Sequence, residues 1–173
     1  MARTVSTRSA TATASTARWL SAEEEAAWRV LATVAAKLPW ALECQLQRDA
    51  GLSYIEYHAL ARLSEDPDHT VRMSVLAELT NASLSRLSHL ITRLESRGLV
   101  RREPDPTDGR FTNAILTKKG YAKLVAAAPA HVAAVRSLVI DNLSPAELRQ
   151  LHKAAQRIVD RLDADNVAVR QMT

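Results

Sequence analysis

Residues 83–97 carry two kinds of side chain, and their spacing suggests a chemistry. Apolar residues recur every three or four positions, which is typical of the buried face of an α-helix. Most of the remaining positions hold hydroxyl, imidazole or guanidinium groups, which can donate hydrogen bonds. Bases in the major groove of DNA present acceptors to such donors, and that groove is wide enough for one helix. The apolar set is Leu84, Leu87, Leu90, Ile91 and Leu94. The polar set is Ser83, Ser85, Arg86, Ser88, His89, Thr92 and Arg93.

Within this polar set, Arg86 and His89 are the leading candidates for reading bases. The serines can bond either bases or phosphates, whereas Thr92 and Arg93 are better placed for contacts with the DNA backbone. The plainer interpretation is an amphipathic helix whose polar face meets only water. The preceding residues favour DNA binding, because a short helix and a tight turn over residues 73–83 complete a helix-turn-helix.

A charged hairpin is predicted after this polar helix. Residues 99–103 and 111–116 have the pattern of two strands, and residues 104–110 between them are rich in turn formers. At the tip, Arg110 can enter the narrow minor groove, where the negative potential of DNA is concentrated, while Asp108 holds its guanidinium in position. The alternative is a solvated turn with a local ion pair. A hairpin beside a helix-turn-helix forms a wing.

The elements that must position these side chains are mostly helical. Three serines each precede a glutamate by three residues, which is the capping-box signal for a helix start. These pairs are Ser21 with Glu24, Ser53 with Glu56, and Ser144 with Glu147, the last followed by Pro145. The predicted helices are residues 21–38, 39–49, 53–64, 73–80, 84–97, 118–142 with a bend or break at Pro129, and 145–164.

The composition agrees with a mainly α fold carrying a small β-hairpin wing. The chain has 173 residues, of which 47% are hydrophobic and only 4% aromatic, with 4 glycines, and these values favour helix over sheet. The net charge of +4 is compatible with a polyanionic partner. Residues 1–18 contain Ser, Thr, Ala and Arg but no acid, so we interpret them as a disordered arm, with a transit peptide as the alternative.

The run from Leu76 to Leu116, LAELTNASLSRLSHLITRLESRGLVRREPDPTDGRFTNAIL, followed by TKKG, resembles the core of the MarR (multiple antibiotic resistance regulator) family. It shows in order a helix, a recognition helix, an RLE..GLV.R junction, an Asp-x-Arg wing and an LT..G return to helix. The resemblance implies a winged helix-turn-helix regulator of transcription, a repressor in our interpretation. It implies a homodimer that places two recognition helices in successive major grooves of a pseudo-palindrome. Arg86 stands where small residues are frequent and His89 where Arg is common, so the half-site cannot be transferred from relatives.

This resemblance sets the expected organisation of the chain. The expected parts are a disordered arm (1–18), N-terminal dimerisation helices (19–50), the winged helix-turn-helix lobe (51–117), C-terminal dimerisation helices (118–165) and a frayed tail (166–173). The apolar residues after the lobe support a dimer independently, because they exceed what a small winged helix can cover. They are Val132, Val135, Leu138, Val139, Leu143, Leu148, Leu151, Ile158 and Leu162.

Regulators of this type usually bind a small aromatic or anionic effector between the dimer helices and the DNA-binding lobe. Seven residues fall in the helices that resemble the walls of that cleft, and they combine apolar bulk with polar groups. They are Trp19, Trp28, Trp40, Tyr54, Tyr57, His58 and Arg62. The alternative is that the tryptophans pack in the core or in the dimer interface. His58 stands in the approximate place of an acid that urate-sensing members use, which argues against urate.

Other classes of function lack their sequence signals. The chain has no glycine-rich phosphate loop, metal-binding triad or nucleophile elbow, so we expect no enzyme, metal or cofactor. A winged helix that contacts only proteins, or a thiol redox sensor through Cys44, remains an alternative, although a single cysteine between leucines is more often a small buried side chain. One cysteine and no apolar run of roughly 18 residues predict a cytoplasmic protein outside the membrane.

Overall fold

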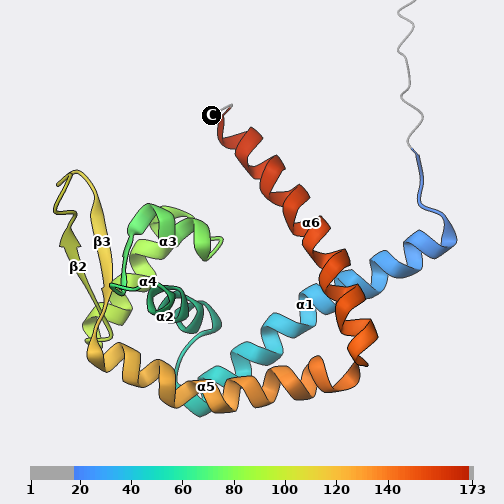
Figure 1. Ribbon diagram of the computed structural model, residues 1–173, viewed down its shortest axis with the longest axis horizontal. Helices are drawn as coiled ribbons and strands as arrows, with labels where there is room; N and C mark the ends of the chain where they lie inside the picture. Colours follow the sequence, from blue (N-terminus) through green and yellow to red (C-terminus); the bar gives the residue numbers. More distant parts are fainter. Residues whose placement is uncertain (1–17, 172–173) are drawn as a thin grey trace, which may run out of the picture. The chain divides into compact units, whose positions relative to one another are not determined.

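A computed structural model describes residues 18–171 of the chain, with side chains up to residue 164 (Figure 1). The described residues divide into two units, residues 18–36 and residues 37–171. The predicted disordered arm, residues 1–18, lies outside the described residues, apart from Arg18.

Helix α1 (Ala22–Ala50) begins in the first unit and ends in the second. Its start has the predicted capping box, because the Ser21 amide donates to Glu24 at 2.8 Å and the Glu24 amide donates to the Ser21 hydroxyl at 3.2 Å. The prediction of two helices that meet at Pro39 is wrong, since the helix continues through it. Pro39 lies at an exposed position, where water can satisfy the carbonyl group that loses its amide partner.

Helix α2 (Tyr54–Glu65) follows the turn at Gly51 and agrees with the prediction. Ser53 is its N-cap, and the reciprocal bonds with Glu56 are both present, at 3.2 and 2.9 Å. Leu60 and Leu63 of this helix are fully buried in the core of the second unit.

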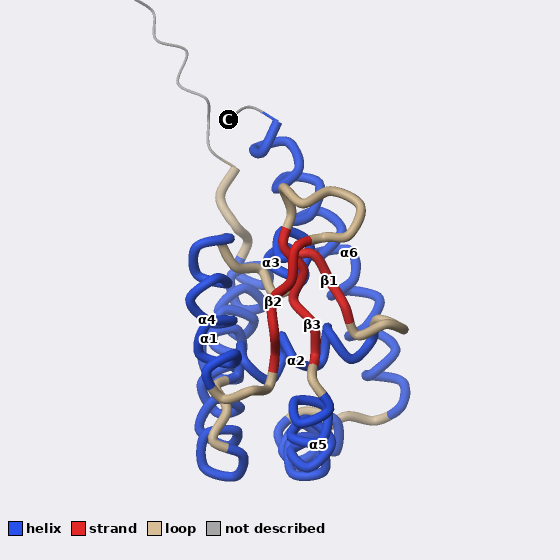
Figure 2. The backbone as a smooth tube through the Cα atoms, turned by 90° about the vertical axis from the view of Figure 1, so that its left-hand side faces the viewer, coloured by secondary structure: helices blue, strands red, loops and turns tan. Residues whose placement is uncertain are grey.

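The sheet has three strands rather than the predicted two. Strand β3 (Thr112–Leu116) lies between β1 (Thr70–Arg72) and β2 (Val100–Pro104), and both pairings are antiparallel (Figure 2). Ala114 in the middle faces Val71 on one side and Arg102 on the other. The sequence analysis missed β1 because its three residues are too few for an alternating pattern.

Two helices joined by a tight turn precede the hairpin, as predicted. They are α3 (Met73–Leu79) and α4 (Leu84–Ser96), and Asn81 between them has a positive φ of 49°. Gly98, with φ of 70°, ends α4 and leads into β2.

The buried face of α4 is the predicted one with a single exception. Leu87, Leu90, Ile91 and Leu94 are buried in the core, whereas Leu84 is exposed. On α3, Leu76 is buried, whereas Val75 and Leu79 are exposed. Met73 and Ala77 are also buried and join Leu76 in the core.

The chain then returns to helix through α5 (Lys118–Leu138), the short 3-10 helix η1 (Ile140–Asn142) and α6 (Pro145–Gln171). Pro129 does not interrupt α5, and α6 extends well beyond the predicted end at residue 164 into the segment expected to fray. Gly120, in the first turn of α5, must be glycine because a Cβ there would lie 2.0 Å from the Leu99 carbonyl oxygen.

Residues 118–142 also form a segment that is long and apolar enough to cross a membrane, and most of it is exposed. The expectation that no apolar run approaches such a length is therefore wrong for this segment. Length and composition alone are weak evidence for a membrane span, because an apolar helix that packs against other protein surfaces has the same properties.

Candidate nucleic-acid interface

The outer face of α4 presents hydrogen-bond donors, as the sequence predicted. Ser83 is the N-cap, and its hydroxyl accepts from the Arg86 amide at 3.3 Å. Ser85, Arg86 and His89 are exposed, whereas Ser88 is half-buried. Among the described residues, no ion pair engages the side chain of Arg86 or His89. Their donors are free to meet a ligand.

The second half of the same face is partly engaged within the protein. The Thr92 hydroxyl donates to the Ser88 carbonyl at 2.9 Å and accepts from the Arg102 guanidinium at 3.1 Å. Arg93 lies 3.6 Å from the buried carboxylate of Glu56, although most of its side chain is exposed. The candidate residues thus separate into a free N-terminal group and a tethered C-terminal group.

Arg102 fastens the hairpin to α4. Its guanidinium donates to the Glu95 carboxylate at 2.7 and 3.0 Å, and its backbone amide donates to the same side chain at 3.1 Å. These bonds hold the pKa of Glu95 below its ordinary value, against the opposing effect of burial. Because charge-assisted hydrogen bonds join β2 to α4, the wing is held in a fixed position relative to the polar face of α4.

The wing tip has the predicted ion pair. The Arg110 guanidinium donates to both carboxylate oxygens of Asp108, with Nε at 3.0 Å from Oδ1 and Nη2 at 2.8 Å from Oδ2. This bonding lowers the pKa of Asp108 and raises that of Arg110. The arginine side chain is 86% exposed, so the pair orients a cation at the surface of the hairpin.

A second carboxylate, which the sequence analysis did not single out, shapes the wing loop. Asp105 is buried and accepts from the Thr107 hydroxyl at 2.6 Å, the Arg72 guanidinium at 2.8 Å and the Thr107 amide at 2.9 Å. These bonds hold its pKa far below the usual range. The Arg72 guanidinium also lies 4.8 Å from the centre of the Phe111 ring. The Asp-Pro-Thr spacing could have indicated an Asx turn, but nothing in it indicates the distant partner Arg72.

A hollow of about 270 Å³ lies between α4 and the wing. One wall comes from the helix-turn-helix and the other from the hairpin. Its lining residues are Met73, Ser74, Leu84, Ser88, Arg102, Arg110, Phe111 and Thr112. The tip arginine and the N-terminal turn of α4 therefore face the same space.

The residues predicted to form an effector cleft are only partly brought together. In the second unit, the Tyr54 and His58 rings lie 4.3 Å apart, and Tyr57 lies 4.3 Å from His131 of α5. His131 contacts Gln45 at 3.2 Å. Arg62 instead pairs with Glu65 at 2.9 Å on the surface.

Burial affects the two histidines of this cluster in the same way. Burial lowers the pKa of His58 below its ordinary value, and the charges of His131 and Arg62 act in the same direction. Burial also lowers the pKa of His131. The Nε2 atom of His58 is buried and has no hydrogen-bond partner among the described residues.

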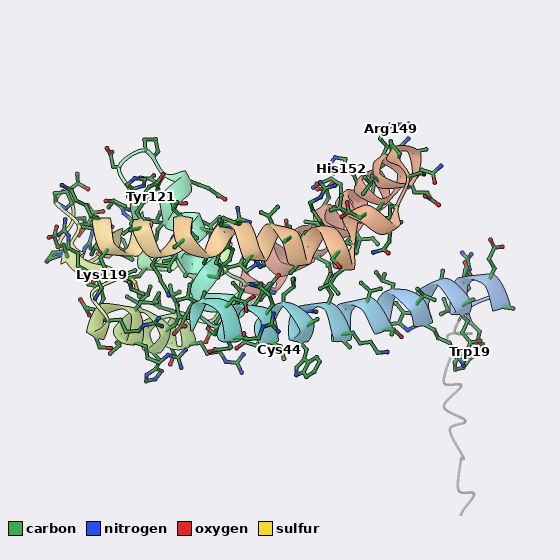
Figure 3. All side chains as sticks on the ribbon, turned by 90° about the horizontal axis from the view of Figure 1, so that it is seen from below. Trp19, Cys44, Lys119, Tyr121, Arg149 and His152 are labelled. Carbon is green, nitrogen blue, oxygen red and sulfur yellow. The ribbon has the colours of Figure 1, made fainter. Side chains whose placement is uncertain are left out.

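The three tryptophans and Cys44 are not core residues: Trp19 precedes α1, and Trp28, Trp40 and Cys44 are exposed positions of that helix. Trp19, Trp28 and Trp40 are 86%, 59% and 71% exposed. Cys44 is also exposed on α1, so the prediction of a small buried side chain is wrong (Figure 3).

Taken together, a helix-turn-helix with free donors on its second helix and a charged hairpin beside it define a winged-helix DNA-binding protein. The family model described as MarR family matches residues 50–110. Sco3205 from Streptomyces coelicolor, a MarR family transcriptional regulator solved in complex with DNA, is 42% identical; the match covers 86% of this chain and 92% of that one, with a TM-score of 0.82. AbsC, a MarR family transcriptional regulator from the same organism, is 43% identical, with 86% and 99% covered and a TM-score of 0.81. The chain belongs to the MarR family: it is a DNA-binding transcriptional regulator and not an enzyme.

Two more distant relatives are also similar to this chain. The transcriptional regulator HosA from Escherichia coli O111:H- is 34% identical over 74 residues, which are 43% of this chain and only about half, 53%, of HosA. CouR from Rhodococcus jostii RHA1, whose structure contains bound p-coumaroyl-CoA, is 25% identical, with 75% of this chain and 88% of CouR covered and a TM-score of 0.66.

Proposed function

We propose that the protein binds a pseudo-palindromic operator as a homodimer, with α4 in the major groove and the wing in the adjacent minor groove. The observation that carries this proposal is that Leu84 and Ser88 of α4 line the same hollow as Arg110 of the wing. Arg86 and His89 read bases, while Ser83, Ser85 and Ser88 bond bases or phosphates. Thr92 and Arg93, which have partners in the protein, contact the DNA backbone at most. Asp108 positions Arg110.

The dimer part of the proposal rests on the apolar surface of the last two helices. Val132, Leu138, Leu151, Ile158 and Leu162 are each about half exposed. Val135, Val139, Leu143 and Leu148 are partly exposed beside them. A second copy of the chain would cover this surface, and a two-fold dimer would present two α4 helices to successive major grooves.

The regulatory part of the proposal is that a small aromatic or anionic effector releases the DNA, so that the protein acts as a cytoplasmic repressor. The cluster of Tyr54, Tyr57 and His58 supports a site of this kind, because it combines ring faces with an unpartnered buried nitrogen. CouR, a related protein, holds an aromatic and anionic ligand.

Selection of bound duplexes from a random pool tests the proposed operator. We expect one enriched sequence with two-fold symmetry and half-sites about 10 base pairs apart, bound by two chains. Affinity should fall steeply with salt, since phosphate contacts release counterions, whereas an apolar protein interface would respond little. Enrichment of no sequence, or of a site without symmetry, would contradict the proposal. Metabolites can then be screened for release of the selected duplex.

A further inference from the structure

Leu84 is exposed on a helix whose other apolar residues are not. Its side chain is 55% exposed, whereas Leu87, Leu90, Ile91 and Leu94 are buried. A single exposed leucine is common on protein surfaces and needs no explanation by itself. The position of this one is informative, because it directly follows the N-cap Ser83 and shares the first turn of α4 with Arg86.

Leu84 lies in a hollow that is lined by both apolar and polar residues. Leu84 shares the hollow between α4 and the wing with Phe111, which is 41% exposed, and with Met73. Ser74, Ser88, Arg102, Arg110 and Thr112 form the rest of the lining. An apolar group that enters this hollow would contact Leu84, while polar groups beside it would contact the polar lining residues.

We propose that Leu84 is a specificity residue that contacts the C5-methyl group of a thymine in each half-site. Of the four bases, thymine alone carries an apolar group on its major-groove edge, and apolar side chains recognise it. Residues at the N-terminal end of a recognition helix are the ones that face base edges. The inference rests on the proposed placement of α4 in the major groove.

Deoxyuridine provides the test, because it lacks only the methyl group of thymidine. In the duplex selected by the wild-type protein, each thymine is replaced in turn by deoxyuridine, and Kd is measured for wild type and for Leu84→Ala. We expect one replacement per half-site to weaken wild-type binding about threefold to fivefold, the effect of one buried methyl group. The same replacement should leave Kd of Leu84→Ala unchanged.

Leu79→Ala is the matched control, since Leu79 is an exposed leucine of the neighbouring helix that does not line this hollow. It should retain the wild-type response to deoxyuridine. Both substituted residues are exposed, so both variants should fold, and thermal unfolding checks this.

Three results would overturn the assignment of Leu84. The first is that no deoxyuridine replacement changes Kd of the wild-type protein, as expected if Leu84 contacts a deoxyribose. The second is that a replacement changes Kd of wild type and of Leu84→Ala equally. The third is that the selected operator has no thymine in its half-sites. In each of these cases selection would still yield a symmetric operator, so the proposed function would stand and only the assignment of Leu84 would fail. Enrichment of no sequence would instead refute the proposed function and this inference with it.

Discussion

The winged lobe and the two C-terminal helices differ in how far their apolar side chains are buried. In the lobe, Leu60, Leu76, Leu87 and Leu94 are fully buried within one chain, and ion pairs join neighbouring elements. Along α5 and α6 many large apolar residues, among them Val132, Leu138, Leu151, Ile158 and Leu162, stay about half exposed, although Leu124 is buried. The core of the DNA-binding lobe is therefore completed within a single chain, whereas the helices after it leave apolar surface for a further contact.

The largest effect is expected in the core of the lobe. Leu94→Ala should lower the free energy of unfolding by roughly 2–5 kcal/mol, because it leaves a cavity among residues that cannot collapse. Val75→Ala, at an exposed position of α3, should change it by less than about 0.5 kcal/mol. Urea unfolding followed by circular dichroism measures both. Equal losses for the two variants would mean that the lobe is not closely packed.

Substitutions on the exposed apolar faces of α5 and α6 should weaken dimerisation rather than destabilise the fold. Ile158→Glu on α6 should raise the dimer dissociation constant by on the order of a hundredfold or more, because a symmetric interface loses the contact twice. Analytical ultracentrifugation measures this constant. Lys153→Glu, at another exposed position of α6, is the control. A wild-type protein that is monomeric at micromolar concentration would refute the assignment of this surface to a second copy.

Within the lobe, the buried carboxylate of the wing should affect binding without affecting base preference. Asp105→Asn keeps the size of the side chain but weakens the bonds to Arg72 and Thr107. We expect Kd to rise roughly threefold to tenfold on every duplex, since charge-assisted bonds are about twice as strong as neutral ones. The exposed Asp68→Asn carries the same change of charge and should have little effect. A selective loss on one sequence would argue against a purely positioning role.

The smallest effect concerns pH. Because burial lowers the pKa of His58 and His131, the unfolded chain binds protons near pH 6.5 that the folded chain does not bind. Stability should therefore fall as the pH drops from about 7.5 through 6.5 toward 5.5. His58→Gln should reduce this fall, whereas the same change at His152, which is exposed on α6, should not (Figure 3). Thermal unfolding at several pH values would show an unchanged fall if the cluster is not responsible.

The sequence predicted what depends on local spacing. The buried face of α4 follows from apolar residues every three or four positions, and the caps of α2 and α6 follow from Ser53 and Ser144. Periodicity cannot show where a core ends, so Leu84 was assigned to the buried face. It also cannot show pairing between distant residues, and so it missed both β1 and the bond from Arg72 to Asp105, which are 33 residues apart.

In the proposed complex, α4 reads bases while the wing contributes affinity. The most direct test measures Kd of Arg86→Ala, His89→Ala and Arg110→Ala on the selected operator and on a scrambled duplex. The exposed Arg149→Ala of α6 serves as a charge-matched control. For the two α4 variants we expect a loss of roughly 1–3 kcal/mol on the operator and little on the scrambled duplex, and for Arg110→Ala a loss on both. Equal losses of the α4 variants on the two duplexes would contradict the claim.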